Sequence, residues 1–147
     1  MDKQTLVVRP EDYEPALDVV GTKVTVLAAN ETTGGYGMTF QEGPEGSGPP
    51  PHSHAWDEAF FVLEGSVELT FGEESVLAQP GTLVHLPGGP VHSFRYGAGG
   101  GKMLEITGMN SKAATLFRAV DREVSPDAPD VAKAIALLEE NGVTVAV

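Results

Sequence analysis

Along the first two-thirds of the chain, apolar residues occur in short runs that polar, glycine-rich and proline-rich segments separate. Between Ser66 and Phe71, apolar and polar residues alternate with a period of two, which is typical of a strand with one buried and one wet face. Similar runs recur, and we predict strands at residues 6–8, 24–27, 36–40, 60–63, 66–71, 75–78, 82–86, 92–96 and 103–107. Many short strands at hairpin spacing indicate an all-β sandwich or barrel.

Two connections between these strands have the composition of hairpin turns. Glu64 and Gly65 stand between two apolar runs, and a two-residue turn needs a residue that tolerates a positive φ. The glycine-rich residues 97–101 separate the last two predicted strands in a similar way. We therefore expect the chain to reverse direction at both places.

The last third of the chain has a helical pattern. We predict one helix at residues 112–120 and another at 130–141, with Asp127 or Asp130 near its start and Gly142 just past its end.

The second predicted helix has one apolar face, because Val131, Ile135 and Leu138 recur at helical spacing. We expect this face to pack against the outside of the barrel, and residues 143–147 could return as a strand. The predicted organisation is a single domain at residues 1–147, with a small antiparallel barrel at about 20–110 and a helical appendage at about 111–147.

The composition argues against several classes of protein. The 147 residues include 21 acidic and 9 basic ones, and the formal net charge of −12 disfavours nucleic-acid and membrane-surface partners. The absence of cysteine excludes disulfides, thiolate nucleophiles and cysteine-based metal sites. Residues 1–10 lack the apolar core of a signal peptide, and no segment approaches the roughly 20 apolar residues of a membrane span. We expect a cytoplasmic protein whose partner is a small molecule.

Three of the four histidines fall in two short segments that follow loops rich in proline and glycine. Residues i and i+2 of a strand project from the same face, so His52 and His54 can both point inward, and Glu58 keeps their parity. His92 on a partner strand can supply a fourth ligand. Three imidazoles and one carboxylate suit a divalent transition metal ion such as Fe, Mn, Ni, Co, Cu or Zn. His85 is out of step with the apolar face of its strand, and we expect it to be structural or exposed.

Through two motifs that contain these residues, the chain resembles the cupin family. The first motif, G-x5-H-x-H-x3-E-x6-G, is met at Gly46, His52, His54, Glu58 and Gly65. The second, G-x5-P-x-G-x2-H-x3-N, is met at Gly81, Pro87, Gly89 and His92. Only its last position departs, because Tyr96 replaces an asparagine that is not a metal ligand in the family.

The resemblance implies a cupin barrel, which is a double-stranded β-helix or jelly roll, here with one or two C-terminal helices. It implies that one metal ion binds His52, His54, Glu58 and His92. Because cupins are usually dimers, we also expect a homodimer, with strand exchange through residues 6–8 as one route.

Basic residues are absent from most of the predicted barrel, since no Lys or Arg occurs between Lys23 and Arg95. Phosphorylated sugars and polycarboxylates need fixed cations, which only the metal could supply here unless Arg95 or Lys102 turns inward. A neutral phenolic or enolic substrate that chelates the metal fits better. The residues expected to pack against it are Met38, Phe40, Phe60 and Phe94.

Among cupins, the chain resembles single-domain bacterial cupins similar to quercetin dioxygenases, which share a three-His, one-Glu site and a helical C-terminal segment. The implied reaction is oxidative ring cleavage, in which Glu58 takes the hydroxyl proton of the substrate. Two alternatives remain open. A metal-dependent isomerase or lyase of a small sugar or acid would turn over without oxygen, whereas a non-catalytic small-ligand binder would have a closed or absent metal.

Overall fold

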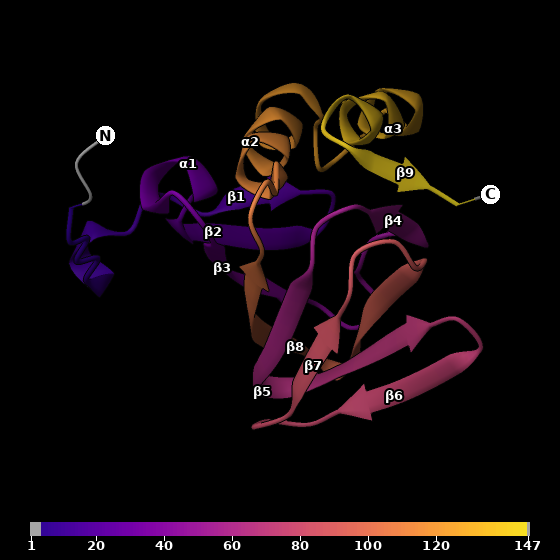
Figure 1. Cartoon of the computed structure of the whole chain (residues 1–147). Coiled ribbons are helices and arrows are strands. Elements are labelled where there is room, and N and C mark those ends of the chain that lie inside the picture. The colour runs from indigo at the N-terminus through magenta and orange to yellow at the C-terminus, as the bar shows by residue number, and fades with distance from the viewer. Residues whose placement is uncertain (1–3, 147) are drawn as a thin grey trace.

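The computed structural model describes residues 4–146 and is dominated by antiparallel strands (Figure 1). The strands are β1 (Leu17–Val19), β2 (Thr22–Ala28), β3 (Gly37–Gly43), β4 (His52–His54), β5 (Glu58–Phe71), β6 (Glu74–Ala78), β7 (Leu83–Leu86), β8 (His92–Thr107) and β9 (Val143–Val145). The helices are the short 3-10 turn η1 (Pro10–Asp12), α1 (Asn30–Thr33), α2 (Ala113–Glu123) and α3 (Val131–Glu140). The prediction of an all-β fold with C-terminal helices is confirmed.

The strands form one curled antiparallel sheet in which β8 is the central member. On one side the order runs β1-β2-β3-β8-β4-β9, and on the other side β8 pairs with β5, which also pairs with β6 and β7. In Figure 1, β5, β6 and β7 lie at the lower end of the molecule, and the C-terminal helices lie at the opposite end. Among the described helices, none is long and apolar enough to cross a membrane.

β5 and β8 form a long two-stranded ribbon that bends in its middle. Their pairing begins at Glu58 opposite Thr107 and continues to Phe71 opposite His92, with register shifts on both sides of Gly65. A straight strand from Glu58 to Phe71 would span roughly 40 Å at about 3.3 Å per residue. The bend is therefore what allows the two ends of the ribbon to approach each other.

Glycine backbones make this bend possible. Gly65 has a φ of +68°, and a Cβ atom added there would lie 2.1 Å from the carbonyl oxygen of Gly100. On the facing strand, Gly99 and Gly100 also have positive φ. An L-residue with a side chain rarely adopts this conformation, and no room exists for one at Gly65.

The predicted chain reversals at Glu64-Gly65 and at residues 97–101 are therefore wrong. Each is a bend within one continuous strand, β5 or β8 respectively. A glycine with positive φ serves a β-bulge as well as a hairpin turn, so the local sequence does not distinguish the two.

The barrel core lies between the two halves of the bent ribbon. Its buried residues come mainly from β5 and β8 and are Phe60, Val62, Val67, Leu69, Ala78, Leu86, Phe94, Tyr96 and Met103. Within β5, Val67 and Leu69 are buried while Glu68 is exposed, which is the alternation that the sequence predicts.

The C-terminal segment differs in position from the prediction. Helices α2 and α3 pack over the open end of the barrel, beside β1 and β9, and not against its outer wall (Figure 1). A second apolar cluster joins them to the barrel and consists of Trp56, Leu116, Ala119, Val120, Val124, Leu137 and Val143. Of the face predicted to be buried, Ile135 and Leu138 are half-buried and Val131 is exposed, while the neighbouring Leu137 is buried.

The ends of α3 follow the sequence signals. The side chain of Asp130 accepts a hydrogen bond from the backbone N–H of Lys133 (3.1 Å), and Gly142 has a positive φ just after the helix. β9 confirms the returning strand and pairs with β4, with Val145 opposite His52 and Val143 opposite His54.

The N-terminal strand predicted at residues 6–8 is absent from the described part of the chain, where residues 4–9 are irregular. Leu6 and Val7 are exposed there, so the chain itself gives these apolar residues no partner strand.

Candidate metal centre

Three strands bring four potential ligands to one point at the open end of the barrel. His52 and His54 lie on β4, Glu58 opens β5, and His92 opens β8 directly opposite His52. Each of the four offers one ligand atom, and these atoms all lie within 4.8 Å of one another. The bent ribbon places Glu58 and His92, which begin its two ends, in contact.

The backbone fixes the orientation of each imidazole. Each Nδ1 atom lies near a backbone carbonyl oxygen. The distances are 2.8 Å from His52 to Pro50, 2.9 Å from His54 to Trp56 and 3.4 Å from His92 to Pro90. A carbonyl can only accept, so Nδ1 carries the proton and donates it. The Nε2 atoms of the three rings are then free to act as ligands, an arrangement typical of metal-binding histidines.

Two buried polar atoms at the centre lack a hydrogen-bond partner. Glu58 Oε1 and His92 Nε2 are buried and lie 2.6 Å apart, yet neither has a well-aligned hydrogen-bond partner. Glu58 Oε1 also lies 3.3 Å from His54 Nε2. Atoms this close need either a proton or a cation between them, and a single metal ion would satisfy all of them at once. The donor set therefore fits a metal ion.

Burial and neighbouring groups set the charges in the centre. Burial raises the pKa of Glu58, but polar contacts with His54 and His92 outweigh it and lower the pKa to about 2. Burial lowers the pKa of His52 to about 4, with a smaller opposing effect from the Pro50 carbonyl. At neutral pH, Glu58 is a carboxylate and His52 is a neutral imidazole. Both are in the forms that bind a metal.

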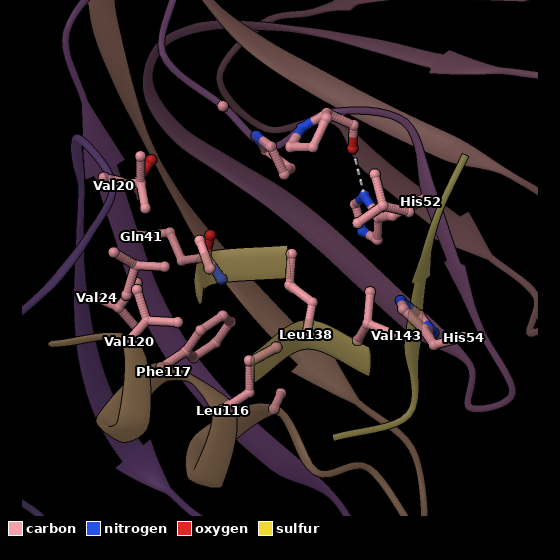
Figure 2. Close-up of a pocket in the computed structure, with 18 of the residues that line it drawn as sticks. Val20, Val24, Gln41, His52, His54, Leu116, Phe117, Val120, Leu138 and Val143 are labelled. Atoms are coloured by element: carbon pink, nitrogen blue, oxygen red, sulfur yellow. Dashed lines mark hydrogen bonds between the residues drawn. The ribbon is translucent and has the colours of Figure 1, made fainter. Parts of the chain in front are cut away.

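A largely apolar cavity of about 380 Å³ opens from this centre (Figure 2). Its walls include Phe60 and Phe94, both predicted to face the substrate. Met38 and Phe40 do not line it, since the inward-facing residues of β3 are those of the other parity, and Phe40 packs against Tyr13. The prediction for these two residues differs from the structure because the buried face of β3 carries Thr39 and Gln41.

The C-terminal segment forms the roof of the cavity. Figure 2 shows Leu116, Phe117 and Val120 of α2 and Leu138 of α3 facing the same space as His52. These helices were predicted to be an appendage, and the structure makes them part of the binding cavity.

The cavity has no basic residue among its described lining. Arg95 is turned away and donates to the carbonyl oxygen of Phe94 (2.8 Å), and the amino group of Lys102 lies 4.7 Å from the centre of the Phe40 ring. His85 is exposed on β7, as predicted. Among the described lining residues, no Lys or Arg therefore supplies a fixed positive charge to this cavity.

Glu105 is a buried carboxyl beside the centre that the sequence analysis did not identify. It lies on β8, is 5% exposed, and lines the cavity. Burial and the Glu58 carboxylate raise its pKa well above the usual range. Strand parity alone does not predict that Glu105 is buried. Glu105 and Thr107 share one face of the strand, whereas the apolar residues Leu104 and Ile106 lie on the other face, which the sequence favours as the buried one.

Comparisons with known proteins agree with this geometry. A family model described as a cupin domain matches residues 38–106. Quercetin 2,3-dioxygenase of Bacillus subtilis (strain 168) is 30% identical over 82 residues, which cover 55% of this chain and 24% of that protein. The chain thus spans about a quarter of the length of this curated relative.

Solved structures share the fold at low sequence identity. An RmlC-like cupin from Shewanella frigidimarina has a TM-score of 0.66 at 16% identity, over 78% of this chain and 99% of that one. The polyketide cyclase RemF from Streptomyces resistomycificus has a TM-score of 0.59 at 23% identity, over 71% of this chain and 80% of that one.

The curled antiparallel sheet and the three-histidine, one-glutamate cluster define a β-barrel protein with a candidate metal site at its open end. The chain contains a cupin domain at residues 38–106, and all four residues of the cluster lie within it.

Proposed function

We propose that this cupin is a metal-dependent dioxygenase that cleaves a neutral phenolic or enolic small molecule. The observation that carries the proposal is a three-histidine, one-glutamate cluster at the edge of an apolar cavity without basic residues among the described ones. The similarity to a quercetin 2,3-dioxygenase supports this class of reaction. The proposed metal ligands are His52, His54, Glu58 and His92.

In this proposal, the chain binds and orients the substrate. The rings of Phe60 and Phe94 pack against its apolar part, and the roof of α2 and α3 excludes water. A bound transition metal ion would polarise a substrate oxygen and lower the pKa of its hydroxyl group. Glu58 is ionised at neutral pH and takes the hydroxyl proton. Dioxygen is the oxidant, and both of its atoms enter the product, so the reaction needs no external reductant.

The experiment combines metal analysis with oxygen uptake. Protein loaded separately with Fe, Mn, Ni, Co, Cu or Zn is screened against neutral phenols and enols in an oxygen electrode. We expect uptake that depends on both metal and substrate and that a chelator abolishes.

Glu58→Gln keeps a carbonyl oxygen as ligand but cannot take a proton, and we expect it to lower the rate by about 100-fold or more. If Glu58→Gln binds metal and keeps full activity, Glu58 is not the group that takes the proton.

The same screen separates the alternatives. Product formation without oxygen uptake would identify an isomerase, lyase or cyclase. Ligand binding without any turnover would identify a binding protein.

A further inference from the structure

Gln41 is a buried polar side chain in a cavity whose walls are largely apolar. It lies on β3, is 3% exposed and lines the cavity. Figure 2 shows its amide group directed toward the interior of the cavity, between Val24 and Leu138. Burying an amide costs free energy unless its N–H and carbonyl groups form hydrogen bonds, so the partners of both groups have to be identified.

The nitrogen of the amide has a partner within the protein. Gln41 Nε2 donates to the hydroxyl oxygen of Thr39 (3.4 Å), and the hydroxyl group of Thr39 donates to Glu105 Oε1 (3.2 Å). Since the single hydroxyl proton of Thr39 points at Glu105, Thr39 can only accept from Gln41. This contact orients the amide, with Nε2 toward Thr39 and the carbonyl oxygen Oε1 away from it.

The carbonyl oxygen of the amide has no donor. Among the described residues, no side-chain or backbone group donates a hydrogen bond to Gln41 Oε1, and this atom is not fully enclosed by protein atoms. Because the residue as a whole is buried, the surface that Oε1 leaves open borders the cavity. A donor for this oxygen therefore has to come from the contents of the cavity.

Gln41 reaches a part of the cavity that is distant from the metal centre. Glu58 lies opposite Thr107 of β8, whereas Gln41 lies opposite Met103 of the same strand. Residues 103 and 107 of a strand are separated by roughly 13 Å at about 3.3 Å per residue. Figure 2 likewise shows Gln41 apart from His54. A molecule bound at the metal centre can therefore meet Gln41 only through a second group at some distance from the first.

We propose that Gln41 is a substrate-binding residue whose Oε1 atom accepts a hydrogen bond from a second hydroxyl group of the substrate. The inference rests on the proposed function and narrows its substrate class to phenols or enols with two separated hydroxyl groups. One hydroxyl group binds at the metal centre, and the other fixes the orientation of the molecule against β3. Apolar pockets commonly select their ligands through a few polar groups of this kind.

The test measures binding of matched pairs of phenols by calorimetry. One pair is 2-naphthol with 2,6-dihydroxynaphthalene, and the other is 4-phenylphenol with 4,4′-biphenol. The protein is loaded with Zn²⁺, which has no redox chemistry, so the measurement requires no turnover. A symmetric diol can bind in two equivalent orientations, which alone favours it by about twofold, so only a larger ratio of affinities indicates a hydrogen bond.

We expect the wild type to bind the diol of at least one pair about 10-fold more tightly than the corresponding phenol. In Gln41→Met and Gln41→Leu, which keep an apolar side chain of similar volume, this ratio should fall to about twofold. Thr22→Val is the matched control, because Thr22 is the other buried hydroxyl-bearing or amide-bearing residue of the described cavity lining. Its ratio should equal that of the wild type. A role of Gln41 in the fold alone would not change the ratio of two affinities.

A wild-type ratio of about twofold or less in both pairs would overturn the inference, and this measurement depends on no variant. An unchanged ratio in the Gln41 variants, or an equal loss in Thr22→Val, would also overturn it. Failure of the wild type to bind Zn²⁺ or any of the four phenols would instead overturn the proposed function, and with it the inference. The two kinds of failure are thus distinguishable.

Discussion

The β5–β8 ribbon contains two regions that are built from different kinds of group. Where its ends meet, the candidate metal centre depends on the side chains of Glu58 and His92. At its middle, shape depends on the backbone of Gly65 and on its close approach to Gly100. The difference teaches that the spacing of side chains indicates a candidate metal centre, whereas the bend that brings its residues together is made of glycines.

The largest effect is expected at the bend. In Gly65→Val the new side chain would meet the Gly100 carbonyl oxygen at 2.1 Å, and its φ of +68° would be strained. Strain and overpacking together should cost more than about 3 kcal/mol of unfolding free energy, enough to prevent folding of a marginal domain. Urea denaturation followed by circular dichroism measures this.

The matched control is Gly72→Ala, where φ is +62° but no atom lies within 4 Å of the added Cβ. It should cost only about 1–2 kcal/mol. Equal losses at the two positions would mean that the bend is no tighter than an ordinary turn.

The next effect is expected where the ribbon ends meet. His92→Ala removes one ligand of the four, and metal affinity should fall by more than about 100-fold, beyond the usual loss for residues that only support ligands. The only tryptophan, Trp56, stacks on His54 at 4.4 Å between ring centres, so its fluorescence can follow a Co²⁺ titration.

Exposed His85 provides the control, because His85→Ala should leave the affinity unchanged. The metal-free His92→Ala protein should lose far less stability than Gly65→Val. A variant that unfolds instead would show that the two regions are not separable.

The smallest effect is a pH dependence of the metal-free protein. The pKa of His52 is about 4 in the folded protein, against 6.5 in the unfolded chain, so between these values only the unfolded chain binds the proton. Stability is therefore lost as pH falls from 6.5 to 4, by at most roughly 3 kcal/mol. Urea denaturation between pH 4.5 and 6.5 measures the profile, and comparison with a His52 variant separates this contribution from those of Glu58, whose pKa is lowered, and Glu105, whose pKa is raised. In His52→Gln the free energy of unfolding should depend less on pH. An unchanged dependence in that variant would mean that a group other than His52 causes it.

Much of the candidate site was predictable because strand parity and fixed spacing are local properties. His52 and His54 share a face by the i, i+2 rule, and the structure places both with Glu58 and His92. The start and end of α3 were likewise predictable from Asp130 and Gly142.

Other features depend on distant contacts and were not predictable in the same way. Whether Gly65 ends a strand or bends it depends on Gly100, which is far along the chain. Burial of Glu105 depends on Thr39 and Glu58, since an isolated Leu-Glu-Ile segment favours the glutamate facing solvent. The position of α2 and α3 depends on which end of the barrel is open, and the sequences of the two helices do not indicate which end that is.

The family match ends at residue 106, whereas the roof of the cavity comes from α2, α3 and β9. β9 also borders the strand that carries two histidines. The four residues of the candidate metal centre and the helices that cover the cavity are therefore separate stretches of sequence. A substitution in α2 or α3 can therefore change the shape of the cavity without replacing any of the four candidate ligands.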